Sequence, residues 1–206
     1  MSRSDTGYLG NINLKKKNVD IEWTPEMLQE YYRCANDPKY FAEEYIKIVH
    51  VDRGFIPIEL YDYQKQIIDL ISNNRKVSVN TSRQAGKTTT AVVLILHYIL
   101  FNDHKTVALL ANKGDAAREI LERIKMAYEA LPKWLQQGVI EWNKGSVVFE
   151  NGSSIIAAAT TGSAIRGQSI SFLYIDETAF VENWDRSEEH TSELQSHHDL
   201  VCRLLL

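Results

Sequence analysis

Apolar and polar residues along the middle of this chain follow the pattern of alternating strands and helices. A short alternating stretch with β-branched residues predicts a strand over Val77–Asn80, and a long apolar run predicts a helix over Thr88–Phe101. That helix is apolar on nearly every face, so we expect it to lie between layers of the fold. A second strand over Thr106–Ala111 and an amphipathic helix over Asp115–Leu131 follow. Short connections between such elements predict a parallel sheet with right-handed crossovers, in one α/β domain.

The residues on either side extend this pattern. Upstream, Thr24 and Asp37 each precede a proline and therefore predict helix starts, whereas Gly54 and Pro57 predict a loop. Downstream, an Asn-Gly pair at 151–152 lies between two stretches with strand character and predicts a hairpin.

Composition limits the classes of function. Of the 206 residues, 44% are apolar and 24% are charged, which is typical of a soluble globular protein. No segment resembles a membrane span or a signal peptide, so we expect an intracellular protein. The net charge of −4 excludes binding of nucleic acid through bulk positive charge. The only basic run, Lys15–Lys17, is expected in a solvated arm. Two cysteines far apart predict neither a disulfide framework nor a zinc site.

Residues 81–88, T-S-R-Q-A-G-K-T, connect the first strand to the first helix and match a phosphate-binding P-loop in which Thr81 replaces the first glycine. Gly86 lets the backbone approach the phosphates, and N–H groups at the helix N-terminus point at the anion. Lys87 is expected to reach the β and γ phosphates, and Thr88 to bind Mg²⁺ through its hydroxyl. The alternative is an ordinary loop that contains G-K-T by chance, but the flanking strand and helix favour phosphate binding.

Two acids follow the last predicted strand. The strand over Ser171–Ile175 is followed directly by Asp176 and Glu177, at the edge where ligands of open α/β sheets bind. Asp176 is expected to hold Mg²⁺, and Glu177 to orient and deprotonate the attacking water. The alternative is a solvated acidic turn, which the P-loop upstream disfavours.

A glutamine beside aromatic residues precedes the first strand. The amide of Gln64 is able to donate to and accept from an adenine edge, and the rings of Tyr61 and Tyr63 are able to stack on a base. Without further context, a solvated surface glutamine and two tyrosines at the edge of the core are the better explanation of the pattern.

Four segments together resemble the large terminase subunit of tailed bacteriophages. They are the aromatic helix after Asp37, Y-D-Y-Q at 61–64, S-R-Q-A-G-K-T at 82–88 and Y-I-D-E at 174–177. The resemblance covers roughly residues 20–185. It implies a P-loop NTPase fold of the ASCE type, a three-layer sandwich with a mainly parallel sheet, and an ATP-driven motor that feeds viral DNA into a procapsid. The family's P-loop usually lacks its first glycine, which accounts for Thr81.

The resemblance also implies roles and partners. Arg83 would be the cis-acting arginine that stabilises charge on the γ phosphate, and Arg166 lies in a loop near the site. The resemblance then implies these nucleotide-binding residues: Tyr63, Gln64, Ser82, Arg83, Gln84, Ala85, Gly86, Lys87 and Thr88. The implied catalytic residues are Glu177, Arg83 and Lys87. Mg²⁺ would be held by Thr88 and Asp176. The implied ligands are ATP and Mg²⁺. The implied partners are double-stranded viral DNA, the portal protein of the procapsid, the small terminase subunit and other copies of the chain in a ring, with no membrane, in the host cell cytoplasm.

These assignments divide the chain into a flexible arm at 1–20, a helical N-terminal segment at 21–60, a partial P-loop ATPase domain at 61–185 and a tail at 186–206. The tail begins R-S-E-E-H-T-S-E-L-Q-S, which resembles a translated sequencing adapter, so we expect it to be non-native. The sheet is then expected to be incomplete at the C-terminus, and Leu204–Leu206 to lack a packing partner. We expect the chain either to fold poorly or to hydrolyse ATP weakly.

Two other functions stay open. A Gln motif, a P-loop and an Asp-Glu pair also occur in helicase-like nucleic-acid translocases, although these usually carry a more glycine-rich P-loop and further arginine motifs in a second domain. Alternatively, a catalytically dead fragment acts only by binding, with residues 20–60 docking to the small terminase subunit or the portal ring.

Overall fold

The computed structural model describes residues 7–50, 54–82, 85–160, 165, 167–176 and 200–205. The helices are α1 (Pro25–Asn36), α2 (Pro38–Tyr45), α3 (Asp62–Asn73), α4 (Lys87–Phe101) and α5 (Gly114–Glu129). The strands are β1 (Lys47–His50), β2 (Gly54–Pro57), β3 (Lys76–Asn80), β4 (Thr106–Ala111), β5 (Val139–Trp142), β6 (Ser146–Phe149), β7 (Ser154–Ala159), β8 (Phe172–Ile175) and β9 (Leu200–Leu205). None of the described helices is long and apolar enough to cross a membrane.

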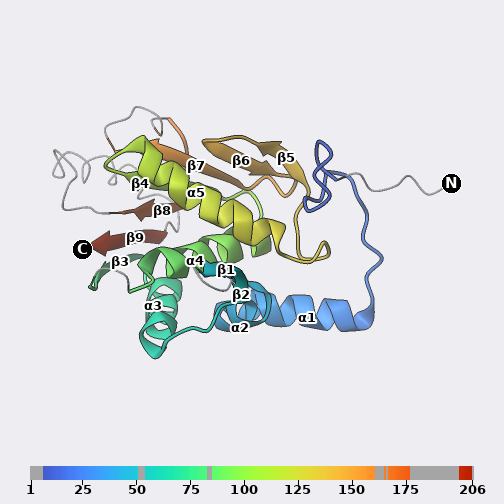
Figure 1. Cartoon of the computed structure of the whole chain (residues 1–206), viewed down its shortest axis with the longest axis horizontal. Helices are drawn as coiled ribbons and strands as arrows, with labels where there is room; N and C mark the ends of the chain where they lie inside the picture. The colour runs from blue at the N-terminus through green and yellow to red at the C-terminus, as the bar shows by residue number, and fades with distance from the viewer. Residues whose placement is uncertain are drawn as a thin grey trace.

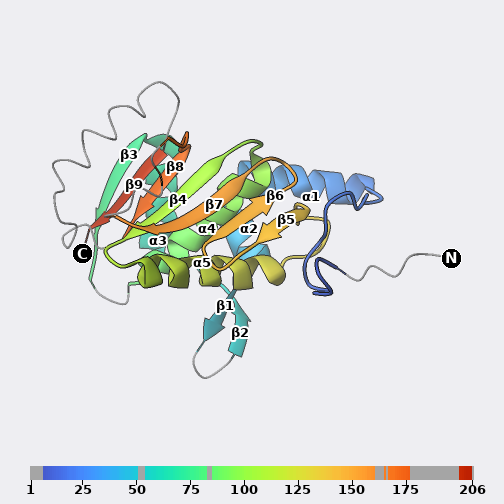
Figure 2. The same ribbon diagram turned by 90° about the horizontal axis from the view of Figure 1, so that it is seen from above.

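Seven strands form one sheet in the order β3-β9-β8-β4-β7-β6-β5 (Figure 2). The first five of these are parallel, because each pairs in parallel with its neighbour. β6 and β5 extend the sheet by antiparallel pairing, and Gly152 lies in the β6–β7 turn with a φ of 77°. The predicted α/β fold with a mainly parallel sheet and the predicted Asn-Gly hairpin are therefore confirmed.

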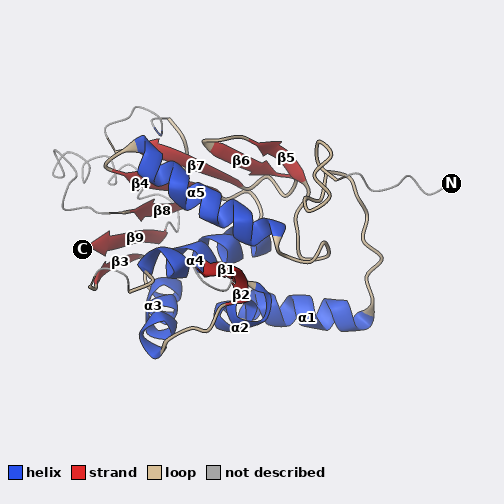
Figure 3. Cartoon of the chain, in the orientation of Figure 1, coloured by secondary structure: helices blue, strands red, loops and turns tan. Residues whose placement is uncertain are grey.

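The helices pack on one face of the sheet, with α4 at their centre (Figures 1 and 3). α5 lies beside α4 and over β4 and β7, while α2 and α3 contact other sides of α4. Alternate residues of β4 face opposite ways: Val107 and Leu109 join the large core with the helices, and Ala108 and Leu110 join a small cluster. Among the described residues, that small cluster contains strand and loop residues only. The apolar character of α4 follows from its enclosure.

Both predicted helix starts are confirmed. The Thr24 hydroxyl accepts a hydrogen bond from the Met27 N–H, and the Asp37 carboxylate caps α2 in the same way. The predicted loop at Gly54 and Pro57 is wrong, because these residues begin and end β2, which pairs antiparallel with β1. Proline is tolerated at the end of an edge strand, where its missing N–H costs no ladder bond. Figure 2 shows this hairpin projecting from the body of the molecule.

Glu30 links α1 to α2. Its Oε1 accepts hydrogen bonds from the hydroxyl groups of Tyr40 at 2.7 Å and Tyr45 at 2.9 Å.

Cys34, one turn further along α1, is fully buried, and burial raises the pKa of its thiol to about 12. The thiol is therefore protonated at neutral pH, which makes it a poor nucleophile.

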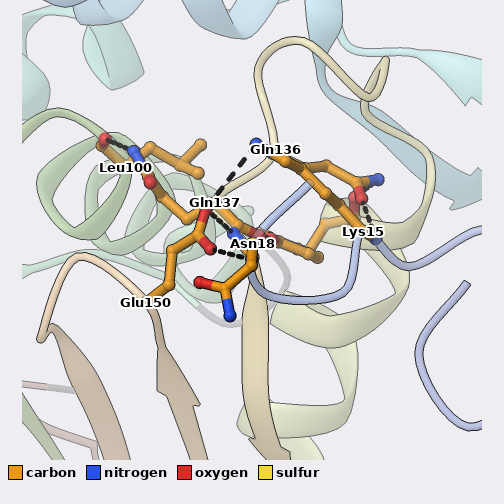
Figure 4. A network of polar contacts seen from close by, with 8 residues as sticks. Lys15, Asn18, Leu100, Gln136, Gln137 and Glu150 are labelled. Carbon is orange, nitrogen blue, oxygen red and sulfur yellow. Dashed lines mark hydrogen bonds and ion pairs between the residues drawn. The ribbon is translucent and has the colours of Figure 1, made fainter. Parts of the chain in front are cut away.

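Part of the N-terminal segment, around Leu14, Lys15 and Asn18, is docked against the rest of the fold, in contrast to the flexible arm predicted for residues 1–20 (Figure 4). The Lys15 N–H donates to Gln136 Oε1 at 2.8 Å, and the Val139 N–H donates to the Lys15 carbonyl at 2.8 Å. Lys15 Nζ lies 3.6 Å from Glu150, and Leu14 is only 1% exposed. The segment therefore covers the edge strand β5, which would otherwise present unpaired backbone groups.

β9 lies between β3 and β8 and pairs in parallel with both. Leu204 and Leu205 have Val79 and Asn80 as their backbone partners in β3. The predicted lack of a packing partner for Leu204–Leu206 concerns side chains and stays a prediction. Without β9, β3 and β8 would face each other with unpaired N–H and C=O groups, and a six-residue extended segment satisfies both edges.

Candidate nucleotide-binding site

The loop between β3 and α4 ends in a left-handed turn at Gly86. Gly86 precedes the first residue of α4 and has a φ of 68° and a ψ of 20°, a conformation that favours glycine. Thr81, at the other end of the loop, is not among the described residues with positive φ. The backbone at position 81 therefore needs no glycine, which explains physically why threonine is tolerated there.

Lys87 folds back over the start of this loop. Its Nζ donates to the carbonyl oxygens of Thr81 at 3.1 Å and Ser82 at 3.3 Å, and the residue is only 8% exposed. An ammonium group has three N–H donors, so the two carbonyls leave capacity for a further acceptor. The positive charge is thus held beside the N-terminus of α4, where the helix dipole also favours an anion.

The first turn of α3 contacts the other end of the loop. The Tyr63 hydroxyl donates to the Ala85 carbonyl at 2.7 Å, and Gln64 Nε2 donates to the Gly86 carbonyl at 3.3 Å. Gln64 Oε1 accepts from the Tyr61 N–H at 3.0 Å, and Gln64 is only 4% exposed. Both ends of the Gln64 amide are therefore occupied by protein groups.

The two tyrosines that were expected to stack on a base stack on each other. The ring centroids of Tyr61 and Tyr63 lie 5.7 Å apart with an interplanar angle of 9°. The residues are 67% and 38% exposed, respectively. They form an exposed aromatic pair next to the loop, and their predicted contact with adenine stays a prediction.

Thr90 also contacts the loop, and sequence reasoning missed it. Its hydroxyl donates to the Gly86 carbonyl at 3.2 Å, and the residue is 1% exposed. The same carbonyl accepts the Thr90 N–H at 3.0 Å as the first bond of α4. The sequence does contain a sign of this contact, because Thr90 lies four residues after Gly86. A threonine hydroxyl in a helix often donates a hydrogen bond to the carbonyl four residues earlier.

Asp176 and the loop both lie at the carboxyl ends of the parallel strands. Asp176 directly follows β8, and its N–H donates to the Leu110 carbonyl at 2.9 Å. β3 and β8 are separated by one strand, so their ends lie about 10 Å apart, two usual interstrand spacings. Asp176 and Thr88, in the first turn of α4, offer carboxylate and hydroxyl oxygens, the donor type that suits Mg²⁺. The predicted site residues Arg83, Gln84 and Glu177, together with Arg166, lie outside the described residues.

Comparison with known proteins assigns this architecture to one family. The family model for "Terminase large subunit, T4likevirus-type, N-terminal" matches residues 79–201, a range that includes most of the tail beginning at residue 186. The fold is similar to the crystal structure of the HK97 bacteriophage large terminase, with a TM-score of 0.67 and 18% identity over 83% of this chain and 37% of that one. It is also similar to the large terminase ATPase domain of Thermus phage P74-26, with a TM-score of 0.55 and 18% identity over 70% of this chain and 64% of that one.

A third similar structure carries a nucleotide. It is the large terminase of a thermophilic bacteriophage in complex with ATP-gamma-S, with a TM-score of 0.52 and 13% identity over 71% of this chain and 38% of that one. The chain therefore spans between about a third and two thirds of the length of these solved chains. The shared P-loop ATPase fold agrees with the predicted fold class.

Proposed function

Because the chain belongs to the terminase large subunit family, we propose that it is the ATP-binding and ATP-hydrolysing part of a viral DNA-packaging motor. The observation that carries this proposal is the loop between β3 and α4, where Lys87 is held beside the helix N-terminus and Asp176 follows a parallel strand of the same sheet. A similar large terminase binds ATP-gamma-S, which supports ATP as the nucleotide.

In this proposal the loop binds the phosphates through its backbone. The N–H groups of Gly86, Lys87 and Thr88 point toward the β phosphate, and the α4 dipole adds favourable charge. Lys87 exchanges part of its contact with the carbonyls of Thr81 and Ser82 for the phosphate oxygens. Ser82 and Ala85 would contribute main-chain atoms to the phosphate site, and Gln84 is assigned to it by the family resemblance.

Thr88 and Asp176 are the residues that would hold Mg²⁺, and the ion supplies charge neutralisation at the phosphate oxygens. Hydrolysis is assigned to Glu177, which orients the attacking water and accepts its proton, and to Arg83, which stabilises charge on the γ phosphate in cis. Both assignments rest on the family resemblance and on their positions next to Asp176 and within the loop.

The motor role brings further partners. We assign to the assembly double-stranded viral DNA, the portal protein of the procapsid, the small terminase subunit and other copies of the chain in a ring, in the host cell cytoplasm. With a net charge of −4, this chain contacts DNA through local basic positions only. The ATPase domain is assigned to residues 61–185 and the segment 186–206 to a non-native tail, because residues 186–196 resemble a translated adapter. Long-read sequencing across codons 185 and 186 tests that assignment: a frame that continues with the tail's own codons contradicts it.

Nucleotide titration of the full chain tests the function. Lys87→Ala removes the ammonium group, and we expect Mg-ATP to bind about 10- to 100-fold more weakly, since a hydrogen bond to a charged group contributes about 1.5–3 kcal/mol. ATP hydrolysis should fall by at least that factor. Lys144→Ala, at an exposed position in the β5–β6 turn, is the control and should bind like the unaltered chain. Equal Mg-ATP affinity in the Lys87→Ala variant would contradict the proposal.

A further inference from the structure

Two side chains of α3 donate hydrogen bonds to two consecutive carbonyl groups of the loop. Tyr63 donates to the Ala85 carbonyl and Gln64 donates to the Gly86 carbonyl, at 2.7 and 3.3 Å. We infer that Tyr63 and Gln64 are positioning residues that aim the loop N–H groups at the phosphates, in place of the base contacts assigned to them by resemblance. The inference rests on the proposed nucleotide-binding function.

The geometry of the peptide bond connects these carbonyls to the phosphate site. A trans peptide unit is planar, and its C=O and N–H point in opposite directions. The Ala85 carbonyl shares its unit with the Gly86 N–H, and the Gly86 carbonyl shares its unit with the Lys87 N–H. Donors on α3 that hold both carbonyls therefore turn both N–H groups to the side away from α3, where the helix N-terminus faces the anion.

The position of Gly86 leaves room for the contact with Gln64 because glycine has no side chain. Its carbonyl accepts from Gln64 and also from the N–H and hydroxyl of Thr90, so the peptide unit is held from two helices. A Cβ at position 86 would lie 2.6 Å from Gln64 Nε2, closer than the two groups are able to approach. The absence of a side chain at Gly86 therefore serves the contact with α3 as well as the left-handed turn.

The state of the two side chains argues against a base contact. Gln64 is 4% exposed, its Oε1 accepts from the Tyr61 N–H, and its Nε2 bonds to the loop. The Tyr63 hydroxyl is used on the loop, and its ring faces the ring of Tyr61. The amide of Gln64 keeps one N–H and one lone pair, but at 4% exposure a base reaches them only if the side chain moves. A positioning role uses the side chains as they lie.

The two roles predict different dependence on the ligand. If Tyr63 orients the loop N–H groups, loss of its hydroxyl weakens every ligand that carries the same phosphates by the same factor. If the Tyr63 ring instead stacks on the base, loss of the hydroxyl leaves that contact intact, and no probe is weakened. If the Tyr63 hydroxyl bonds to adenine, the loss is confined to ATP. The probes are therefore Mg-ATP, Mg-GTP and Mg-tripolyphosphate, the last of which has no base at all.

The experiment is calorimetric titration of the full chain and three variants with these three probes. Tyr63→Phe removes only the hydroxyl, and we expect all three affinities to fall about fivefold, the usual effect of one hydrogen bond. Tyr61→Phe is the matched control, because it keeps the stacked ring pair and its hydroxyl donates to no loop carbonyl in the described part of the chain. Gln64→Leu, which removes the donor to Gly86 without adding a negative charge beside the phosphates, should repeat the uniform loss. Thermal melting of each variant verifies that the fold is kept.

Each outcome decides the matter. A uniform loss with an unchanged ratio of ATP to tripolyphosphate affinity supports positioning. A loss confined to Mg-ATP, or no loss for any probe in either the Tyr63 or the Gln64 variant, overturns it. Failure of the unaltered chain to bind any of the three probes overturns the proposed nucleotide-binding function itself, which separates that failure from the failure of the inference.

Discussion

Gly86→Ala is the substitution whose effect follows most directly from the structure. Gly86 has a φ of 68°, and a residue with a Cβ pays a cost of about 1–2 kcal/mol in that left-handed region. The new methyl group would also lie 2.6 Å from Gln64 Nε2 and must displace it. Loss of that hydrogen bond adds about 1 kcal/mol. We therefore expect the free energy of unfolding to fall by about 2–3 kcal/mol.

Gly54→Ala separates the two contributions. Gly54 has the same φ of 68°, and an added Cβ there would meet no atom of the described residues within 4 Å. Only the backbone cost of about 1–2 kcal/mol applies to it. The assay is urea unfolding of both variants, monitored by far-UV circular dichroism, with Mg-ATP titration alongside. Because Gly86→Ala also releases the α3 contact, it alone should weaken Mg-ATP binding.

Two results would refute this reasoning. Equal destabilisation by Gly86→Ala and Gly54→Ala would mean that Gln64 moves at no cost, so its bond to the loop contributes nothing. Unchanged Mg-ATP affinity in Gly86→Ala would mean that the carbonyl at position 86 does not orient the loop.

Two further predictions concern the support of the site. Glu150→Ala removes the acceptor of the Gly138 and Asn18 N–H groups and leaves the largely buried Lys15 unpaired, so the free energy of unfolding in urea should fall by about 2–3 kcal/mol. The control Glu119→Ala, in an exposed helical ion pair, should lower it by less than about 0.5 kcal/mol. Equal losses in the two variants would contradict the docking of the N-terminal segment. His97 is largely buried, and burial lowers its pKa below 6.5, so the unfolded state binds the proton more readily. Stability should therefore fall as the pH drops below 6.5 toward the folded pKa, and His97→Gln should flatten that slope; an unchanged slope would exclude His97 as its cause.

Local signals in the sequence predicted most of the elements correctly. The capping residues Thr24 and Asp37, the apolar run of α4 and the Asn-Gly turn act through neighbours within a few residues, so they are readable without the fold. The same holds for the loop, since a strand, G-K-T and a helix are contiguous. Asp176 was predicted from a buried strand that ends in an acid.

Long-range contacts account for what the sequence did not reveal. The N-terminal segment looked like a solvated arm because its partners lie far along the chain: 121 residues separate Lys15 from Gln136, and 132 separate Asn18 from Glu150. The sequence suggested that Tyr63 and Gln64 contact a base. Their hydrogen bonds to the loop depend on how close α3 lies to the loop, which the sequence does not reveal. The β1–β2 hairpin was missed because Gly54 and Pro57 are also typical of loops.

The central claim is that this chain binds Mg-ATP at the N-terminus of α4. A crystal structure of the full chain with ATP-gamma-S and Mg²⁺ tests it most directly. We expect the phosphates to lie against the N–H groups of Gly86 and Lys87, with the Lys87 ammonium on a phosphate oxygen. The Tyr63 hydroxyl should still donate to the Ala85 carbonyl. Nucleotide bound elsewhere, or phosphates bound with Lys87 still held only by Thr81 and Ser82, would contradict it.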